Sequence, residues 1–318
     1  MHCSPTKNAG ALRTAMPSRR AAGRADSTTA DRPMTIASAV EACRRRLAGI
    51  ADAPWLEARL LASHVTGLDA SAIVAYGDNE LESSRLQRLA DLTARRISGE
   101  PIAYLVGFKE FCGLRVAVDR RVLVPRPETE ELVEAVAADW KGMAPEILDL
   151  GTGSGAIACA LARRLPRAQL WAVDESAEAL DVARTNVEAH LFLDRITVAP
   201  GDLFAALALD QTFDVIVANL PYVAKGDPDL ARDVRDHEPA MALDGGTDGL
   251  DVYRRMLANA PKRVRPGGSL YFECGPHNAY ELAALARSAF ENGHVEIRED
   301  LAGKARFVIV SLRTEERV

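Results

Sequence analysis

Residues 146–155, EILDLGTGSG, determine the class of fold more directly than any other part of the sequence. A short apolar strand is predicted over 146–150, and it runs into Gly151, Gly153 and Gly155 before a helix begins. Glycine lets a backbone turn sharply and approach a ligand closely, and the start of a helix points N–H groups at any anion placed there. Because the same loop also serves as a plain strand-to-helix turn, it predicts an α/β fold without identifying a ligand.

The residues after about 127 continue this alternation of strand and helix. Helices are expected between the strands, for example over 156–165 and 176–190. Short apolar strands that alternate with helices form a mostly parallel sheet covered on both faces. Residues 299–305 are too few for a helical crossover, so the last strand is expected to be antiparallel. The predicted strands are 146–150, 169–173, 196–199, 213–218, 269–273, 294–298 and 306–312.

The chain before this region divides into three segments. Residues 1–33 are rich in Ala, Arg, Ser and Thr, which predicts a disordered tail or an upstream extension of a chain that truly starts at Met34. Residues 34–99 carry apolar side chains at helical spacing and predict a small helical domain for substrate recognition. Residues 100–126 have the short strands and turns of a β-hairpin linker to the α/β domain over 127–318.

The composition excludes several classes of protein. The 318 residues include 39 Lys and Arg and 45 Asp and Glu, a net charge of −6, which argues against stable binding to nucleic acid. No uninterrupted apolar run reaches the roughly 18 residues of a membrane span. The five cysteines form no C-x-x-C and the six histidines no i, i+4 pair, so neither a disulfide framework nor a metal site is expected. This cysteine usage fits the reducing cytoplasm.

Two acidic residues follow the next two predicted strands. Asp174 follows strand 169–173, where an acid commonly accepts hydrogen bonds from the ribose of an adenosine ligand. Asp202 follows the third strand and has two interpretations: an acceptor for the adenine amino group, or a cap for a helix that starts at Leu203. The glycine loop and Asp174 together predict an adenosine-containing ligand, which is either a dinucleotide or S-adenosylmethionine.

Asn219-Leu220-Pro221-Tyr222 follows strand 213–218 at the carboxyl edge of the sheet, where open α/β sheets bind ligands. An N-x-P-Y tetrapeptide there is typical of methyltransferases that act on planar amino or amide nitrogens, which are poor nucleophiles because their lone pair is delocalised. The side-chain oxygen of Asn219 and the backbone carbonyl of Leu220 would hold the two N–H groups and aim the nitrogen at a sulfonium methyl group. Pro221 keeps the preceding residue extended, and Tyr222 offers a flat face or a hydroxyl. Asn and Pro are also common in strand-ending turns.

With these motifs in view, the chain resembles the release-factor glutamine methyltransferase family over roughly residues 40–312. Several further segments carry the resemblance beside the glycine loop. They are PIAYLVG at 101–107, EFCGL at 110–114, VPRPETE at 124–130, EP at 238–239, ALDGGTDGL at 242–250 and DLAG at 300–303.

The resemblance implies a class I methyltransferase: a Rossmann-like, mostly parallel seven-stranded sheet with its last strand antiparallel, behind a helical domain and a hairpin. It implies S-adenosylmethionine as cofactor, peptide chain release factors as protein partners, and the glutamine of their Gly-Gly-Gln motif as the methylated residue. Substrate binding and catalysis are expected at Asn219, Leu220, Pro221 and Tyr222. Cofactor binding is expected at Gly151, Thr152, Gly153, Ser154, Gly155, Asp174, Asp202, Leu203 and Asn219.

Two departures from the family pattern keep alternatives open. Leu220 stands where the family usually has proline, and the resulting sequence Asn-Leu-Pro-Tyr is familiar from ribosomal-RNA adenine dimethyltransferases. Residues 274–278 lack a glutamine that the family often carries. The alternatives are therefore a glutamine methyltransferase for a ribosomal protein and an RNA adenine N6-methyltransferase. A nucleotide-dependent oxidoreductase would share the glycine loop and Asp174 but gives no reason for residues 219–222. A non-catalytic adapter is a further alternative.

Overall fold

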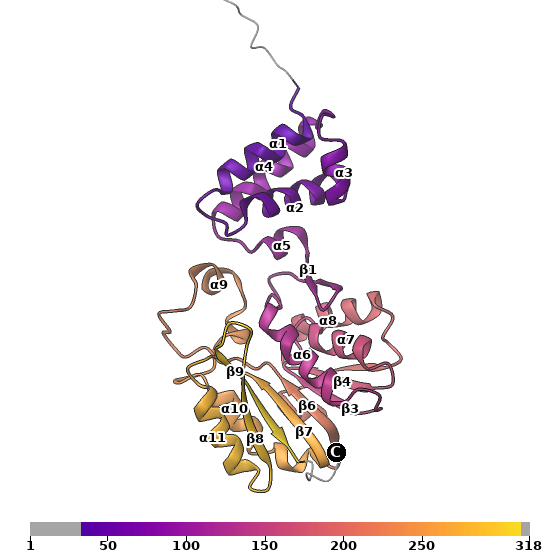
Figure 1. Ribbon diagram of the computed structural model, residues 1–318, viewed down its shortest axis with the longest axis vertical. Helices are drawn as coiled ribbons and strands as arrows, with labels where there is room; N and C mark the ends of the chain where they lie inside the picture. The colour runs from indigo at the N-terminus through magenta and orange to yellow at the C-terminus, as the bar shows by residue number, and fades with distance from the viewer. Residues whose placement is uncertain (1–32, 313–318) are drawn as a thin grey trace, which may run out of the picture.

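The computed structural model describes residues 33–312, so the predicted tail over 1–33 lies outside the described residues except for its last residue. The helices of the N-terminal part lie together at one end of the molecule, with the α/β part at the other (Figure 1). Their apolar faces form one cluster that includes Leu47, Leu61 and Leu89. The helices are α1 (Ile36–Leu47), α2 (Pro54–Thr66), α3 (Ala70–Ala75), α4 (Ser83–Ile97) and α5 (Ile102–Val106).

Local sequence sets the ends of these helices. The Thr35 hydroxyl accepts a hydrogen bond from the N–H of Ser38 (3.2 Å) and caps α1. Helix α2 starts at Pro54, whose fixed φ suits a first turn, and ends at Gly67, which takes a left-handed φ of 75°. The helical domain that the apolar spacing predicts is therefore present.

The hairpin linker is shorter than the segment predicted for it. Strands β1 (Phe108–Phe111) and β2 (Leu114–Ala117) pair antiparallel around a turn at Cys112 and Gly113. Residues 102–106 form helix α5 instead of strand, and no strand follows β2 before α6. Val122 and Val124 are buried as their apolar character predicts. The N–H of Val124 donates to the Glu238 carboxyl (3.0 Å) and not to a neighbouring strand, so this part of the linker is irregular.

A seven-stranded sheet with the order β5-β4-β3-β6-β7-β9-β8 forms the centre of the α/β part. Strands β5, β4, β3, β6 and β7 pair in parallel, whereas β9 pairs antiparallel with both β7 and β8. This confirms the predicted fold class and the antiparallel last strand. The strands are β3 (Glu146–Leu150), β4 (Gln169–Asp174), β5 (Ile196–Pro200), β6 (Phe213–Ala218), β7 (Val264–Glu273), β8 (His294–Glu299) and β9 (Ala305–Ser311).

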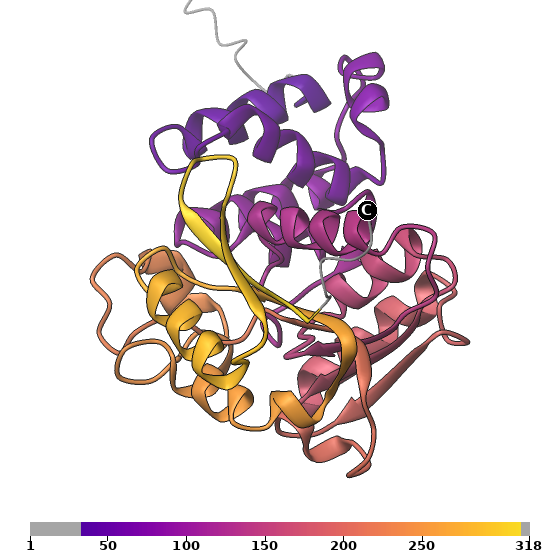
Figure 2. The same cartoon turned by 60° about the horizontal axis from the view of Figure 1, so that its bottom comes forward.

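Helices cover both faces of this sheet (Figure 2). Side chains alternate between the faces, so Ile147 of β3 joins the cluster under α6, α7 and α8, while Leu148 joins the cluster under α10 and α11. These helices are α6 (Pro127–Asp139), α7 (Ala156–Arg164), α8 (Ala177–Ala189), α10 (Asp251–Leu257) and α11 (Ala279–Ala289). Shorter helices are α9 (Arg232–His237), η1 (Leu203–Ala206), η2 (Ala240–Ala242) and η3 (Ala260–Lys262).

Strand β7 begins earlier than the apolar pattern predicts. It includes Val264, which pairs with Phe213 of β6, and the register then shifts so that Ser269 pairs with Val215. The intervening residues contain Pro266 and two glycines, which hid this start from the sequence. Strands β5, β4, β3, β6 and β7 run parallel, so their carboxyl ends lie at the same edge of the sheet. The candidate site lies at this edge.

Candidate functional site

The carboxyl ends of β3, β4, β5 and β6 open onto one cavity of about 460 Å³. The loops that follow these strands all contribute to its wall, together with Arg121, Val122, Leu123 and Pro125 of the linker. Predicted site residues that line it are Gly151, Thr152, Gly153, Ser154, Asp174, Asp202, Leu203, Asn219, Leu220 and Pro221. Gly155 and Tyr222 do not line it.

The glycine loop makes a turn that a residue with a side chain would disturb. Gly151 has a φ of 69°, and a Cβ atom there would lie 2.9 Å from Cδ2 of Leu220. The N–H groups of Gly151 and Thr152 both donate to the carbonyl of Val173, at 2.9 and 3.0 Å, so the loop folds back onto β4. Gly155 serves packing: a Cβ atom there would come within 3.2 Å of the Ala183 methyl group on α8.

Asp174 ends β4 and holds the glycine loop in place. Its Oδ2 accepts from the N–H of Gly153 (2.8 Å) and its Oδ1 from the N–H of Ser176 (2.9 Å). Burial raises the pKa of this carboxyl, and the backbone hydrogen bonds oppose that effect. Each oxygen of an ionised carboxylate has a second lone pair, so Asp174 can still accept a hydrogen bond from a hydroxyl group of a ligand in the cavity.

Asp202 does not cap a helix, as one of its two interpretations required. A short 3₁₀ helix starts at Leu203, but the Asp202 side chain makes no capping hydrogen bond. Asp202 pairs instead with Arg255 of α10, and both residues line the cavity. Leu203 has a φ of 52°, which is unusual for a residue with a side chain.

Residues 218–220 are held by Tyr253, a fully buried residue of α10. The N–H of Leu220 donates to the Tyr253 hydroxyl (3.2 Å), and this hydroxyl donates to the Glu273 carbonyl. The Leu220 side chain is buried against the glycine loop. Asn219 lines the cavity, and its Nδ2 donates to Oγ1 of Thr129 (3.3 Å).

Tyr222 points into the protein. Its hydroxyl donates to Oε1 of Glu273 (3.3 Å), and its carbonyl accepts from Nδ2 of Asn278 (3.2 Å). Burial raises the pKa of the Tyr222 hydroxyl well above its usual value, so the phenol stays protonated. We expect Tyr222 to shape the site from behind, because its hydroxyl is already bonded.

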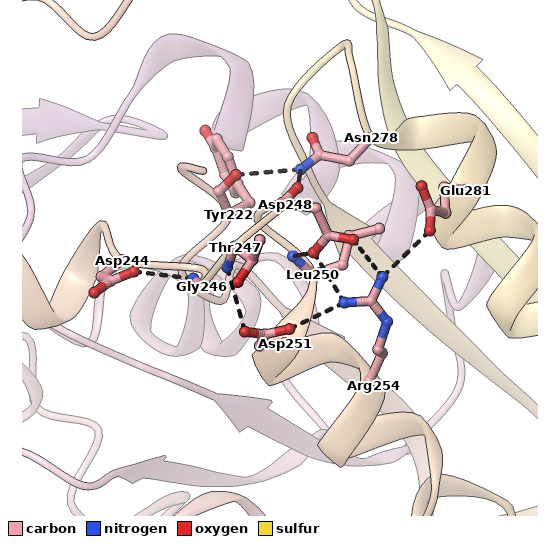
Figure 3. A network of polar contacts seen from close by, with 10 residues as sticks. All are labelled: Tyr222, Asp244, Gly246, Thr247, Asp248, Leu250, Asp251, Arg254, Asn278 and Glu281. Atoms are coloured by element: carbon pink, nitrogen blue, oxygen red, sulfur yellow. Dashed lines mark hydrogen bonds and ion pairs between the residues drawn. The ribbon is translucent and has the colours of Figure 1, made fainter. Parts of the chain in front are cut away.

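Residues 244–250 form a tight loop behind Tyr222 (Figure 3). The Asp248 carboxylate accepts from the N–H of Leu250 (3.1 Å) and pairs with Arg254, which also contacts Asp251 and Glu281. The loop approaches the neighbouring backbone so closely that a Cβ atom on Gly249 would lie 2.3 Å from the Tyr222 carbonyl oxygen. This polar network therefore fixes the backbone behind residues 219–222.

Two buried carboxyl groups near the cavity, those of Asp149 and Glu273, were not predicted from the sequence. Asp149 is fully buried at the end of β3, where its Oδ2 accepts from the Thr152 hydroxyl (2.6 Å) and burial raises its pKa to about 7. Glu273 ends β7 in a similar position, and burial raises its pKa to about 7 as well. A charged residue at the end of an otherwise apolar strand is the signal that could have found both.

The sheet order, the glycine loop, Asp174 and the N-x-P-Y segment on one cavity define a class I methyltransferase, a class whose methyl donor is S-adenosylmethionine. A family model described as a methyltransferase small domain matches residues 127–235, and one described as the PrmC N-terminal domain matches residues 38–107. The chain belongs to the release factor glutamine methyltransferase family.

Several curated relatives carry the name release factor glutamine methyltransferase. The relative from Rhodopirellula baltica is 40% identical over 263 residues, which cover 81% of this chain and 89% of the relative. The relative from Bordetella pertussis is 42% identical and covers 80% of this chain and 93% of its own length. The relative from Moorella thermoacetica is 39% identical, and the match covers 89% of this chain and 100% of the relative.

A solved structure of the hMettl16 catalytic domain has the same fold. It matches with a TM-score of 0.52 at 18% identity and covers 72% of this chain and 84% of that chain. None of the helices over residues 33–312 has the length and apolar character that a membrane crossing requires.

Proposed function

We propose that the protein methylates the side-chain N5 nitrogen of the glutamine in the Gly-Gly-Gln motif of peptide chain release factors, with S-adenosylmethionine as methyl donor. One observation carries this proposal: Asn219, Leu220 and Pro221 line the same cavity as the glycine loop and Asp174. The names of the relatives support the release factor as substrate.

The cavity suits S-adenosylmethionine. Gly153 has a positive φ of 55°, and no atom lies within 4 Å of a Cβ placed there, so the loop is open for close approach to a ligand. Asp174 is expected to accept the ribose hydroxyls. The Asp202 carboxylate, which pairs with Arg255 in the cavity wall, is expected to accept a hydrogen bond from the adenine amino group.

The residues of the protein position the target amide. When bound, S-adenosylmethionine supplies a methyl group made electrophilic by a positively charged sulfur. Oδ1 of Asn219 and the carbonyl of Leu220 each accept one N–H of the target amide, so that the nitrogen faces the methyl group. Leu220 occupies the position usual for proline in the family without loss of this role, because only its backbone carbonyl contacts substrate. Immediately after it gains the methyl group, the amide carries a positive charge. This cation is strongly acidic and loses its proton to water, so this step requires no general base.

The helical domain over residues 34–99 is expected to bind the body of the release factor. Two large apolar side chains near the start of α2, Trp55 and Leu56, are exposed on it. Exposed apolar residues of this size suit a protein contact. The cytoplasm is the expected compartment, since Cys43, Cys112, Cys159 and Cys274 are buried free thiols.

The test is mass spectrometry of a purified bacterial release factor after incubation with the protein and S-adenosylmethionine. We expect one added methyl group, mapped to the glutamine of Gly-Gly-Gln, and none on a matched release factor that carries Asn in place of that glutamine. Ribosomal proteins and ribosomal RNA are incubated in parallel. Methylation of either of these, with the release factor unmodified, would contradict the proposal.

A further inference from the structure

A buried carboxyl group lies directly beneath the N-x-P-Y segment. Glu273 is 1% exposed, and its Oε1 accepts from the Tyr222 hydroxyl (3.3 Å). The Thr129 hydroxyl lies beside the same carboxyl and lowers its pKa. Oε2 of Glu273 is buried and has no hydrogen-bond partner among the described residues. Above about pH 7 the Glu273 carboxyl is ionised. An ionised carboxylate accepts hydrogen bonds and donates none, so the hydroxyl hydrogens around it then point toward Glu273.

This direction has a consequence for Asn219. Thr129 is 3% exposed and has a single hydroxyl hydrogen, for which the unpartnered Oε2 of Glu273 is a neighbouring buried acceptor. Its oxygen is therefore left to accept, and it accepts from Nδ2 of Asn219 at 3.3 Å. If the Asn219 amide were rotated by half a turn, its Oδ1 would face the Thr129 oxygen with no hydrogen between them.

A carboxamide has its acceptor on one side and its donors on the other. One of the two Nδ2 hydrogens of Asn219 is directed at Thr129, and Asn219 lines the cavity. Because no described residue donates to Oδ1, this oxygen is the acceptor that Asn219 has left for a ligand. An acceptor is what the N–H of a target amide needs. The orientation of this one side chain therefore decides whether the site can hold an amide nitrogen or would repel it.

We propose that Thr129 is a positioning residue that fixes the Asn219 amide with Oδ1 toward the substrate, and that Glu273 is the acceptor that sets the direction of this hydrogen-bond chain. The inference rests on the proposed function, because the target amide is what Oδ1 is said to hold. It adds a specificity device: the chain Asn219–Thr129–Glu273 favours a carboxamide substrate over a carboxylate.

The variants Thr129→Val and Thr129→Ser test this directly, because valine keeps the shape and removes the hydroxyl while serine restores it. For Thr129→Val we expect the kcat for release factor to fall roughly 10- to 100-fold. The KM for release factor and the affinity for S-adenosylmethionine should stay within about threefold, because the lost contact acts on orientation and not on binding area. Thr129→Ser should recover most of the lost kcat.

A second readout distinguishes orientation from general damage. A release-factor peptide with Glu in place of the target Gln should inhibit the wild-type protein poorly, since Oδ1 of Asn219 repels a carboxylate. In Thr129→Val the amide is free to rotate and donate, so inhibition by the Glu peptide relative to the Gln peptide should improve at least about tenfold. Thr93→Val, at another buried threonine in the helical domain, should change neither value.

The orientation is also measurable without turnover, from the side-chain ¹⁵N resonance of Asn219, assigned by its loss in Asn219→Asp. This resonance should shift in Thr129→Val and return in Thr129→Ser. If wild-type protein fails to methylate the release factor, the proposed function is wrong, and the resonance still decides the role of Thr129. If Thr129→Val leaves the resonance, the kcat and the peptide preference unchanged, the role given to Thr129 is wrong.

Discussion

Asp149 shows how burial changes the chemistry of a single residue next to the cavity. Its carboxyl is faced by the Thr152 hydroxyl, by the Asp174 carboxyl and by the Cys159 thiol, with no basic side chain among the causes that act on its pKa. Burial raises this pKa from 3.8 to about 7. The folded protein therefore holds the Asp149 proton more tightly than the unfolded chain does.

A dependence of stability on pH follows from Asp149. The stabilisation that its proton provides is complete below about pH 4 and is lost as the pH rises through about 7. Asp149→Asn removes this loss and keeps an acceptor for Thr152. In urea denaturation, the free energy of unfolding of Asp149→Asn relative to wild type should rise by about 1–3 kcal/mol between pH 5 and pH 8. Asp181→Asn, at an exposed aspartate, should show no such rise, and an equal difference for Asp149→Asn at both pH values would contradict the account.

Two elements, the glycine loop after β3 and the segment after β6, form the site by packing against each other. Gly151 is where they touch, since its missing Cβ leaves room for the buried Leu220 side chain. Gly142 offers a comparison, because its φ of 77° is also left-handed but no atom lies within 4 Å of a Cβ placed there. A comparison of substitutions at these two glycines therefore distinguishes the effect of a strained backbone from the effect of a contact with Leu220.

The matched variants Gly142→Ala and Gly151→Ala test this packing. Each should lower the free energy of unfolding by about 1–2 kcal/mol through its left-handed backbone. Only Gly151→Ala should also weaken binding of S-adenosylhomocysteine, by at least about tenfold, because the added methyl group displaces Leu220 and with it the cavity wall. Calorimetric titration measures this. Equal affinities for the two variants would show that the loop and the segment are not coupled.

At the scale of the whole molecule, the order of elements could be predicted because it depends on local pattern. Apolar strands, glycine turns and helical spacing each occupy a few consecutive residues, and they predicted the sheet and its antiparallel last strand. The residues that contact the N-x-P-Y segment from other elements were not predictable in this way. Thr129 belongs to α6 and Glu273 to β7, and only the packing of these elements brings both beneath the same segment.

The linker shows the same limit. Residues 118–126 have the apolar content of a strand, yet Val124 bonds to Glu238, a residue far along the chain that also pairs with Arg126 at 2.5 Å. The side chain of Glu238 is 1% exposed, so a long-range contact and not local propensity determines the path of the linker. Asp202 is similar, because its pairing with Arg255 depends on how α10 is placed.

In the proposed mechanism, the whole fold presents Asn219 and the Leu220 carbonyl to an inert amide beside the methyl donor. The most direct measurement of this is the single-turnover rate of release-factor methylation by Asn219→Ala, together with its affinity for S-adenosylmethionine. We predict a rate at least about 100-fold lower than that of the wild-type protein, with the affinity within about threefold. Methylation by Asn219→Ala at the wild-type rate would contradict the account.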